Sequence, residues 1–229
     1  MTGSPVLLVD DHALFAQSVQ IGLRAAGIPA DRVTARTASG ILAGCAAAAP
    51  ATVLLDLRLG TGDDGVPIDG LDLVEPVTAT GCRVVVVTGE TEDATWGTAV
   101  ERGAVTVLSK DCALDELVAV VAAVRDGRAV LDEGRRQDLL AAARRAHADE
   151  ESLLAPFRSL SPREDEVLRA LAAGLPAAAI AAAGYVSEAT VRTQIRAVLT
   201  KLRVSSQLQA VALARRAGWL DAPASRDPR

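Results

Sequence analysis

Four short apolar runs of this chain each end at a side chain that can take part in chemistry. Two runs stop at carboxylates, the first at Asp10 and Asp11 and the second at Asp56. The other two stop at the hydroxyl of Thr88 and the ammonium of Lys110. If the runs are neighbouring parallel strands, these groups meet at one edge of one sheet, where ligands of such sheets bind. Three acids, a hydroxyl and an amine together indicate a phosphoryl-binding site.

Carboxylates packed this closely need a cation. Like charges raise each other's pKa unless a positive charge lies between them. Mg²⁺ suits the position, because it accepts a few carboxylates and keeps water and phosphate oxygens as its other ligands. A carboxylate held there can act as a nucleophile and form an aspartyl phosphate. An ammonium and a hydroxyl can then bind the phosphoryl oxygens.

The runs alternate with helical patterns, which favours right-handed strand–helix–strand units and a parallel sheet covered on both faces. We therefore predict a doubly wound, five-stranded α/β domain of the flavodoxin-like type. The predicted strands are Val6–Val9, Val53–Leu55, Arg83–Val87 and Val105–Leu108, with a weaker candidate at Arg32–Arg36. The predicted helices are Ala13–Ala26, Ser39–Ala49, Gly70–Thr78, Ala94–Arg102 and Leu114–Arg125.

Composition limits the class of protein. Of 229 residues, 50% are apolar but only 2% aromatic, so the cores must be aliphatic. No apolar run reaches the roughly 18–20 residues of a membrane span, and the start lacks the basic segment of a signal peptide. Three widely spaced cysteines, Cys45, Cys82 and Cys112, give neither a disulfide set nor a metal motif. We expect a cytoplasmic protein without a membrane partner.

Charge divides the chain unevenly. Residues 1–156 carry 13 basic and 23 acidic side chains, whereas residues 157–229 carry 11 basic and 6 acidic ones. An acidic part joined to a basic part suggests a nucleic-acid-binding module tethered to another domain. We predict four segments: the α/β domain 1–126, a helical linker 127–157 ended by Pro156, a small all-α domain 158–222 and a disordered tail 223–229.

The basic part has the pattern of a helix-turn-helix. The stretch Ser161-Pro162-Arg163-Glu164 is a capping box that opens a helix. A short helix at 177–183 is followed by a turn at Gly184-Tyr185, and Ser187 caps a further helix, Glu188–Leu202. The last helix has a predicted buried stripe of Val191, Ile195, Val198 and Leu202, and an opposite face of Arg192, Thr193 and Arg196.

With Val9-Asp10-Asp11-His12 at the first strand end and the acid, hydroxyl and amine that follow in order, residues 5–126 resemble the receiver domain of NarL/FixJ-type bacterial response regulators. The resemblance implies that Asp56 is the phosphoacceptor. It also implies a Mg²⁺ site made of Asp11, Asp56, the Arg58 carbonyl and, through water, Asp10. Thr88 would be the switch hydroxyl and Lys110 the phosphoryl-pairing amine. The donor would be a sensor histidine kinase or a small acyl phosphate.

Residues 158–222 resemble the LuxR-type helix-turn-helix. The resemblance rests on Leu160-Ser161-Pro162-Arg163-Glu164, Ser187-Glu188-Ala189-Thr190-Val191-Arg192 and Lys201-Leu202. It implies that Arg192, Thr193 and Arg196 face the major groove of promoter DNA, with Thr190 and Lys201 nearer the phosphates. A final helix at Ser206–Gly218 would pair a homodimer on two half-sites. Alanines at 177–179, 182–183 and 189 replace side chains that are often polar or basic in relatives, which predicts weak binding by an isolated domain.

Three departures from the receiver pattern concern the site. About six residues are inserted within Gly60–Ile68, directly after Asp56. Val107 occupies a place where receivers normally carry an aromatic that turns inward on phosphorylation. Pro76 lies in the segment Leu73–Gly81, which predicts only a short helix there.

The expected function is a two-component transcription regulator. Phosphorylation of Asp56 would shift the receiver's conformation and dimerisation and so control promoter binding, without enzymatic turnover beyond self-dephosphorylation. One alternative is a regulator that works independently of phosphorylation, which the insertion and Val107 favour. Another is an aspartate-based phosphatase, but such enzymes generally keep a second acid two residues after the nucleophile, where this chain has Arg58.

Overall fold

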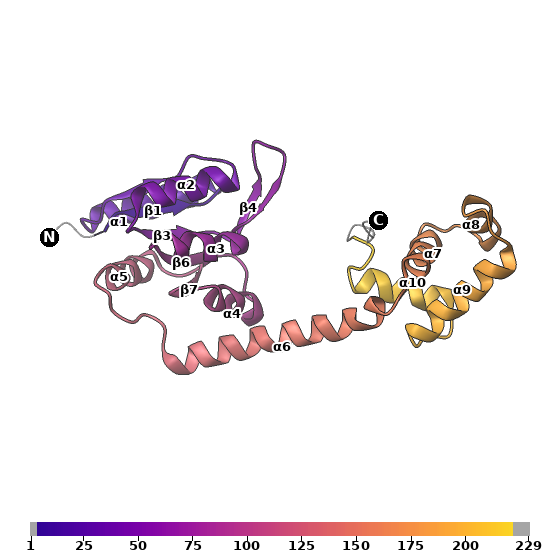
Figure 1. The fold of residues 1–229 in the computed structure, drawn as a ribbon. Helices are drawn as coiled ribbons and strands as arrows, with labels where there is room; N and C mark the ends of the chain where they lie inside the picture. The colour runs from indigo at the N-terminus through magenta and orange to yellow at the C-terminus, as the bar shows by residue number, and fades with distance from the viewer. Residues whose placement is uncertain (1–3, 222–229) are drawn as a thin grey trace. The chain divides into compact units, whose positions relative to one another are not determined.

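The computed structural model describes residues 4–221, which form two compact units that divide between Ala146 and His147 (Figure 1). The division falls inside the predicted linker, and the predicted tail 223–229 lies outside the described residues. Within the described part of the chain, no helix is long and apolar enough to cross a membrane.

The first unit is built on a five-stranded sheet in which all neighbouring strands are parallel and the order is β2-β1-β3-β6-β7. The strands are β1 Val6–Val9, β2 Ala30–Arg32, β3 Thr52–Leu55, β6 Arg83–Thr88 and β7 Thr106–Ser109. This architecture confirms the predicted doubly wound fold. The edge strand β2 begins earlier than the weak candidate at Arg32–Arg36, because it pairs with β1 by placing buried Ala30 beside Val6.

Helices cover both faces of this sheet, as expected for parallel strands. Helices α2, α3 and α4 contribute to one apolar core, and α1 and α5 contribute to the other. The alternating side chains of the strands divide between these two cores. The helices are α1 Ala13–Ala25, α2 Ala38–Ala48, α3 Gly70–Ala79, α4 Asp93–Glu101 and α5 Leu114–Arg125.

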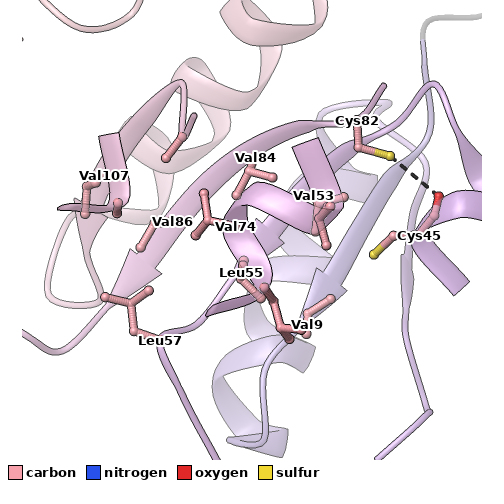
Figure 2. Close-up of a cluster of buried hydrophobic side chains, with 14 of the residues drawn as sticks. Val9, Cys45, Val53, Leu55, Leu57, Val74, Cys82, Val84, Val86 and Val107 are labelled. Atoms are coloured by element: carbon pink, nitrogen blue, oxygen red, sulfur yellow. Dashed lines mark hydrogen bonds between the residues drawn. The ribbon is translucent and has the colours of Figure 1, made fainter. Parts of the chain in front are cut away.

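The first core, shown in part in Figure 2, is aliphatic with two buried cysteines. Cys82 Sγ lies 3.5 Å from the carbonyl oxygen of Cys45 and donates to it. The pKa of the Cys45 thiol is raised to about 11, mainly by burial and to a smaller extent by the nearby Cys82. Val107 lies in the same core, paired in register with Val86 of the neighbouring strand. The position that is aromatic in many receivers is therefore filled here by a packed valine.

The insertion after Asp56 folds as a hairpin rather than an unstructured loop. Strands β4 Arg58–Thr61 and β5 Pro67–Asp69 form a separate antiparallel sheet. Leu59 and Ile68 point inward and are buried in the first core. Asp64-Gly65 supplies the turn, with Gly65 at a φ of 77°. An Asp-Gly pair between apolar residues is a strong hairpin signal, and it was present in the sequence.

Helix α6, Glu133–Arg158, begins six residues after the start of the predicted helical linker 127–157 and extends one residue beyond its end. The expectation that Pro156 ends it is wrong, because the helix continues to Arg158. Pro156 lacks the N–H that would donate to the carbonyl of Ser152, so the helix loses this one bond, and only two helical residues follow the proline. The two ends of α6 belong to different units: Leu139 is buried in the first core, and Phe157 is buried in a core of the second unit.

The second unit, as far as residue 221, contains four further helices, and its caps at Ser161 and Ser187 match the sequence prediction. Ser161 and Glu164 form the reciprocal capping box, and Ser187 accepts a hydrogen bond from the Thr190 amide. The Trp219 ring stacks on Phe157 with centroids 5.2 Å apart, and its indole N–H donates to buried Asp165. The helices are α7 Pro162–Ala172, α8 Ala177–Ala183, α9 Glu188–Lys201 and α10 Gln207–Arg216.

Candidate functional site

The predicted carboxylates converge at the carboxyl edge of the sheet. Strands β1 and β3 are adjacent and in register, so Asp10 and Asp11 meet Asp56, whose amide donates to the carbonyl of Val9 at 2.9 Å. Ligand atoms of these three acids and of His12 all lie within 4.8 Å of one another. Asp56 is almost fully buried, with 2% of its surface exposed, whereas the Asp11 side chain is 32% exposed. The cluster therefore has a deep and a shallow side.

Lys110 binds the deep side of this cluster. Its Nζ lies 2.7 Å from Asp56 Oδ2 and 2.8 Å from Asp10 Oδ2, and it sits 4.9 Å from the centre of the Phe15 ring. Its amide donates to the carbonyl of Thr88, which places it at the end of β7 beside β6. Burial lowers the pKa of Lys110, but its hydrogen bonds to the two carboxylates prevail and raise the pKa overall. The amine thus stays charged where the sequence predicted it.

The electrostatics of Asp56 favour a bound cation. Loss of solvation by burial raises the pKa of the Asp56 carboxyl. The hydrogen bond from Lys110 and a backbone hydrogen bond from Arg58 act in the opposite direction without cancelling it. A carboxylate whose charged form is destabilised by its surroundings gains more than an exposed one from an added positive charge. The cluster therefore fits a hard divalent cation, for which carboxylate oxygens are suitable ligands.

His12 belongs to the cluster, although its role was not predicted. Its Nδ1 lies 2.8 Å from Asp11 Oδ1 and 3.3 Å from Lys110 Nζ. Its backbone amide donates to Asp10 Oδ1 at 2.7 Å, which fixes the turn after β1. The only signal in the sequence was its position directly after the acidic pair. His12 therefore lies against Asp11, the most exposed of the three carboxylates, and the imidazole is a further candidate ligand.

Thr88 lies at the end of β6 and Arg58 at the start of β4, and both are hydrogen-bonded to Glu90. Thr88 is fully buried at the end of β6, and its Oγ1 accepts a hydrogen bond from the Glu90 amide at 3.2 Å. Arg58 Nε donates to Glu90 Oε1 at 2.7 Å. Among the described residues, no hydrogen bond joins the Thr88 hydroxyl to Asp56. The roles predicted for the Thr88 hydroxyl and for the Arg58 carbonyl remain predictions.

In the second unit, α9 presents the predicted polar face to solvent. Its stripe of Val191, Ile195, Val198 and Leu202 is buried as predicted, and the opposite face is exposed. Arg192 Nη2 lies 3.0 Å from Glu188 Oε2, an exposed pair of the kind that contributes little stability and can be exchanged for a stronger partner. Thr193 donates to the carbonyl of Ala189, and Arg196 is exposed. These side chains are available to an anionic partner.

Two further predicted DNA contacts are engaged within the unit. The Thr190 hydroxyl lies 2.9 Å from the Ser187 hydroxyl at the start of α9. Lys201 Nζ donates to Glu164 Oε2 at 2.6 Å and to the carbonyl of Ser159 at 2.9 Å. Lys201 therefore ties the end of α9 to the capping box of α7. A phosphate contact by Lys201 would require it to leave or share these partners.

A doubly wound domain with an acidic edge, together with a helix-turn-helix, defines the class of signal-receiving, DNA-binding regulators. The family model for the response regulator receiver domain matches residues 6–122, and the model for bacterial regulatory proteins of the luxR family matches residues 158–214. The chain belongs to the two-component response regulators of the NarL/FixJ type, which carry a LuxR-type DNA-binding domain.

Two sequence relatives of similar length support this membership. The probable transcriptional regulatory protein NarL of Mycobacterium tuberculosis is 32% identical, with 94% of this chain and 95% of the relative covered. The nitrate/nitrite response regulator protein homolog of Haemophilus influenzae is 30% identical, with 91% and 94% covered. Among solved structures, full-length FixJ from B. japonicum is 26% identical over 96% of this chain and 100% of that chain, with a TM-score of 0.44.

Proposed function

We propose that Asp56 accepts a phosphoryl group with the help of Mg²⁺, and that this modification controls promoter binding by the second unit in the cytoplasm. The observation that carries the proposal is the pairing of a buried carboxylate with an amine. Asp56 Oδ2 lies 2.7 Å from Lys110 Nζ, with Asp10 and Asp11 beside it. A cationic group and a metal-binding pair around one nucleophilic oxygen are what phosphoryl transfer requires.

The residues that would hold the ion are Asp11, Asp56 and the carbonyl of Arg58, with Asp10 acting through water. The three carboxylates fit Mg²⁺ because they supply hard oxygen ligands around a carboxyl whose pKa is raised by burial. Bound Mg²⁺ would neutralise charge on the carboxylates and the incoming phosphoryl oxygens. His12 adds a nitrogen donor at the exposed side.

The transfer step exchanges one bond for another. An Asp56 carboxylate oxygen forms a P–O bond as the P–N bond to the phosphohistidine of a sensor kinase breaks. The bonding electrons leave with the imidazole, which takes up a proton. Lys110 then moves from the carboxylate to a phosphoryl oxygen, and the Thr88 hydroxyl donates to another. We infer no catalytic turnover of other substrates, so the chain acts as a phosphoacceptor with at most self-dephosphorylation.

The output of this modification would be a homodimer on two half-sites. Arginines 192 and 196 lie on the exposed face of α9 and can each make a bidentate contact to guanine. Alanines over 177–183 leave few cations for phosphates, so one domain alone would bind weakly. Dimerisation offsets that weakness because the second half-site is then bound at high effective concentration.

Intact mass after incubation with Mg²⁺ and acetyl phosphate tests the first step. We expect a single phosphoryl adduct on the parent protein and none on Asp56→Asn. Asp126→Asn, the same substitution at an exposed aspartate after α5, serves as the matched control and should react like the parent. An adduct retained by Asp56→Asn, or absent from folded parent protein, would contradict the assignment of the nucleophile.

A second candidate function, regulation without phosphorylation, is favoured by Val107. Its side chain is 6% exposed and packed in the first core, so it has no ring to swing between two positions. Comparing dimerisation before and after phosphorylation in the parent and in Val107→Tyr separates the two candidates. A larger response in Val107→Tyr would support a weak native readout, and identical strong responses would exclude it. DNA binding that ignores phosphorylation in the parent would support the second candidate.

A further inference from the structure

A cavity of about 270 Å³ lies beside the acidic site in the first unit. Its walls are the end of β1, the segment 32–36 after β2, helix α2 and the β4–β5 hairpin. This volume is slightly below the usual range for ligand pockets, about 300–1,000 Å³, so it would suit only a small molecule. Because the hairpin supplies one wall, the cavity depends on the insertion that follows Asp56.

The hairpin is fixed against the opposite wall. The Asp63 amide donates to the carbonyl of Arg36 at 2.9 Å, and Arg36 Nε lies 3.3 Å from Asp63 Oδ1. The Gly62 amide donates to the carbonyl of Val66 at 2.8 Å and closes the turn. These bonds hold the hairpin tip at the entry to α2, so the cavity is formed without a ligand. A preformed site avoids the ordering cost that a flexible loop would add to binding.

One part of the cavity lining is apolar. Val9, Ile41, Leu59 and Ile68 line it, and each is buried in the first core. Leu59 and Ile68 come from the two strands of the hairpin, one on each side of its turn. This lining would bind an aliphatic or aromatic body of a few atoms, at roughly 25 cal/mol for each Å² of apolar surface that leaves water.

The rim carries charges of both signs on different strands. Arg32, at the end of β2, has an exposed side chain and no ion-pair or hydrogen-bond partner within residues 4–221. Asp11, after β1, keeps 32% of its side chain exposed; its Oδ1 pairs with His12, and within residues 4–221 its Oδ2 has no ion-pair partner. The other two charges are already occupied, Arg36 by Asp63 and Asp10 by Lys110. One guanidinium and one carboxylate oxygen, Asp11 Oδ2, therefore remain beside an apolar surface.

We propose that this cavity binds a small zwitterion with an apolar body, of the chemical class of the apolar α-amino acids. The ligand carboxylate would pair with Arg32, the ligand ammonium with Asp11, and the side chain would enter the space between Ile41, Leu59 and Ile68. Neither charge of the ligand would be left without a partner, which is the condition for binding a charged molecule beside apolar surface. The cavity shares Asp11 with the acidic site, but ligand binding there involves no phosphoryl transfer to Asp56.

Shared use of Asp11 couples this cavity to the metal site. An ammonium paired with Asp11 lowers the negative charge available to Mg²⁺, so each ligand weakens the other. Linkage requires that the amino acid lowers the affinity for Mg²⁺ by the same factor as Mg²⁺ lowers the affinity for the amino acid. The cavity would then report a metabolite to the acidic site without any phosphoryl transfer.

The test is a titration of the ¹⁵N-labelled full chain with leucine, phenylalanine and methionine, followed by amide chemical shifts. We expect at least one of them to give saturable shifts at Thr34, Ile41 and Ile68 below about 10 mM. N-acetyl-leucine lacks the ammonium and leucinamide lacks the carboxylate, so each should bind at least about tenfold more weakly than leucine. Arg32→Gln should weaken binding similarly, and Arg128→Gln, an exposed arginine away from the cavity, should not.

Two outcomes would overturn the proposal. One is the absence of saturable shifts at the cavity with all three amino acids. The other is equal binding of leucine and its two singly charged derivatives, which would show that the charges are not recognised. Neither outcome affects phosphorylation of Asp56, which the intact-mass experiment measures separately. A Mg²⁺ titration with and without the bound amino acid then measures the coupling factor.

Discussion

The two units of this protein present their functional side chains in opposite ways. In the first unit, the reactive groups are buried and bound to one another, with Lys110 between Asp10 and Asp56. In the second unit, Arg192 and Arg196 stand exposed on one helix whose other face is packed. The first site is assembled from several strands far apart in the sequence, whereas the second needs only one helix and its caps.

We therefore expect the acidic site to be more sensitive to substitutions that shift the backbone than the exposed face of α9. A backbone shift of a fraction of an ångström at one strand end would disturb every group of the acidic site, because each is held by another. Exposed arginines on α9 depend only on the presence of the helix, so their loss should change binding but not folding. The predictions below test this contrast, beginning with the largest expected effect.

Two glycine substitutions compare backbone and side-chain surroundings. A Cβ on Gly70 would collide with the carbonyl oxygen of Asp56, which is rigid backbone beside the acidic site. A Cβ on Gly184 would collide with the guanidinium of Arg163, which can swing away. We expect Gly70→Ala to lower the free energy of unfolding by about 3 kcal/mol, and Gly184→Ala by less than about 1 kcal/mol. Urea denaturation of both variants measures the difference, and equal losses would contradict the argument.

Arg196 and Lys201 of α9 should differ in whether their loss affects mainly promoter binding or mainly stability. Arg196→Ala should weaken promoter binding by about 1–3 kcal/mol and change the free energy of unfolding by less than about 0.5 kcal/mol. Lys201→Ala should lower stability by about 1 kcal/mol, because it leaves the largely buried Glu164 carboxylate without its ion pair. Arg158→Ala, which removes an exposed ion pair, is the control. Gel shifts measure the DNA affinity, and denaturation curves measure the stability. Equal losses of affinity and of stability in both variants would refute the distinction between the two residues.

The capping box offers a test confined to the second unit. Ser161→Ala removes the acceptor for the Glu164 amide and should destabilise α7 by about 1 kcal/mol. The yield of the Asp56 phosphoryl adduct should not change, because the cap and the acidic site belong to different compact units. Thermal denaturation and intact mass on the same preparation measure both quantities. A lower adduct yield would show that the two units are more strongly coupled than we expect.

The smallest expected effect is a difference in pH dependence. Burial raises the pKa of Asp56 above its ordinary value of 3.8, so its contribution to stability is present below that pH and is lost as the pH rises. Burial raises the pKa of Glu164, but hydrogen bonds from Lys201 and Ser161 lower it by more, so the pKa lies below its ordinary value of 4.5. Its contribution is present above that pH and is lost as the pH falls.

Variants that replace each carboxyl with an amide measure how much Asp56 and Glu164 change the stability with pH. Relative to the parent protein, Asp56→Asn should become comparatively more stable as the pH is raised above 3.8. Glu164→Gln should become comparatively less stable as the pH is raised toward 4.5, with no further change above that value. Stability curves between about pH 3 and pH 7, recorded without divalent cations, give both differences. Slopes of the same sign would contradict the assigned causes.

Much of the fold could be predicted from local pattern alone. Valine-rich runs alternating with helical stretches predicted the parallel sheet, and the order of acids, hydroxyl and amine at the strand ends predicted the acidic edge. The cap at Ser187 and the stripe that includes Val191 predicted α9. These signals are local because side-chain direction repeats every two residues in a strand and every 3.6 in a helix.

Contacts between distant segments were decided only by the tertiary structure. The sequence did not indicate that His12 would cover Asp11, that Lys201 would bind Glu164, or that α6 would continue past Pro156. Nor did it reveal that the insertion would close a cavity against Arg36. Side-chain types and spacing determine which groups reach the sheet edge. Register and packing, which depend on residues far apart in the chain, determine which of those groups touch.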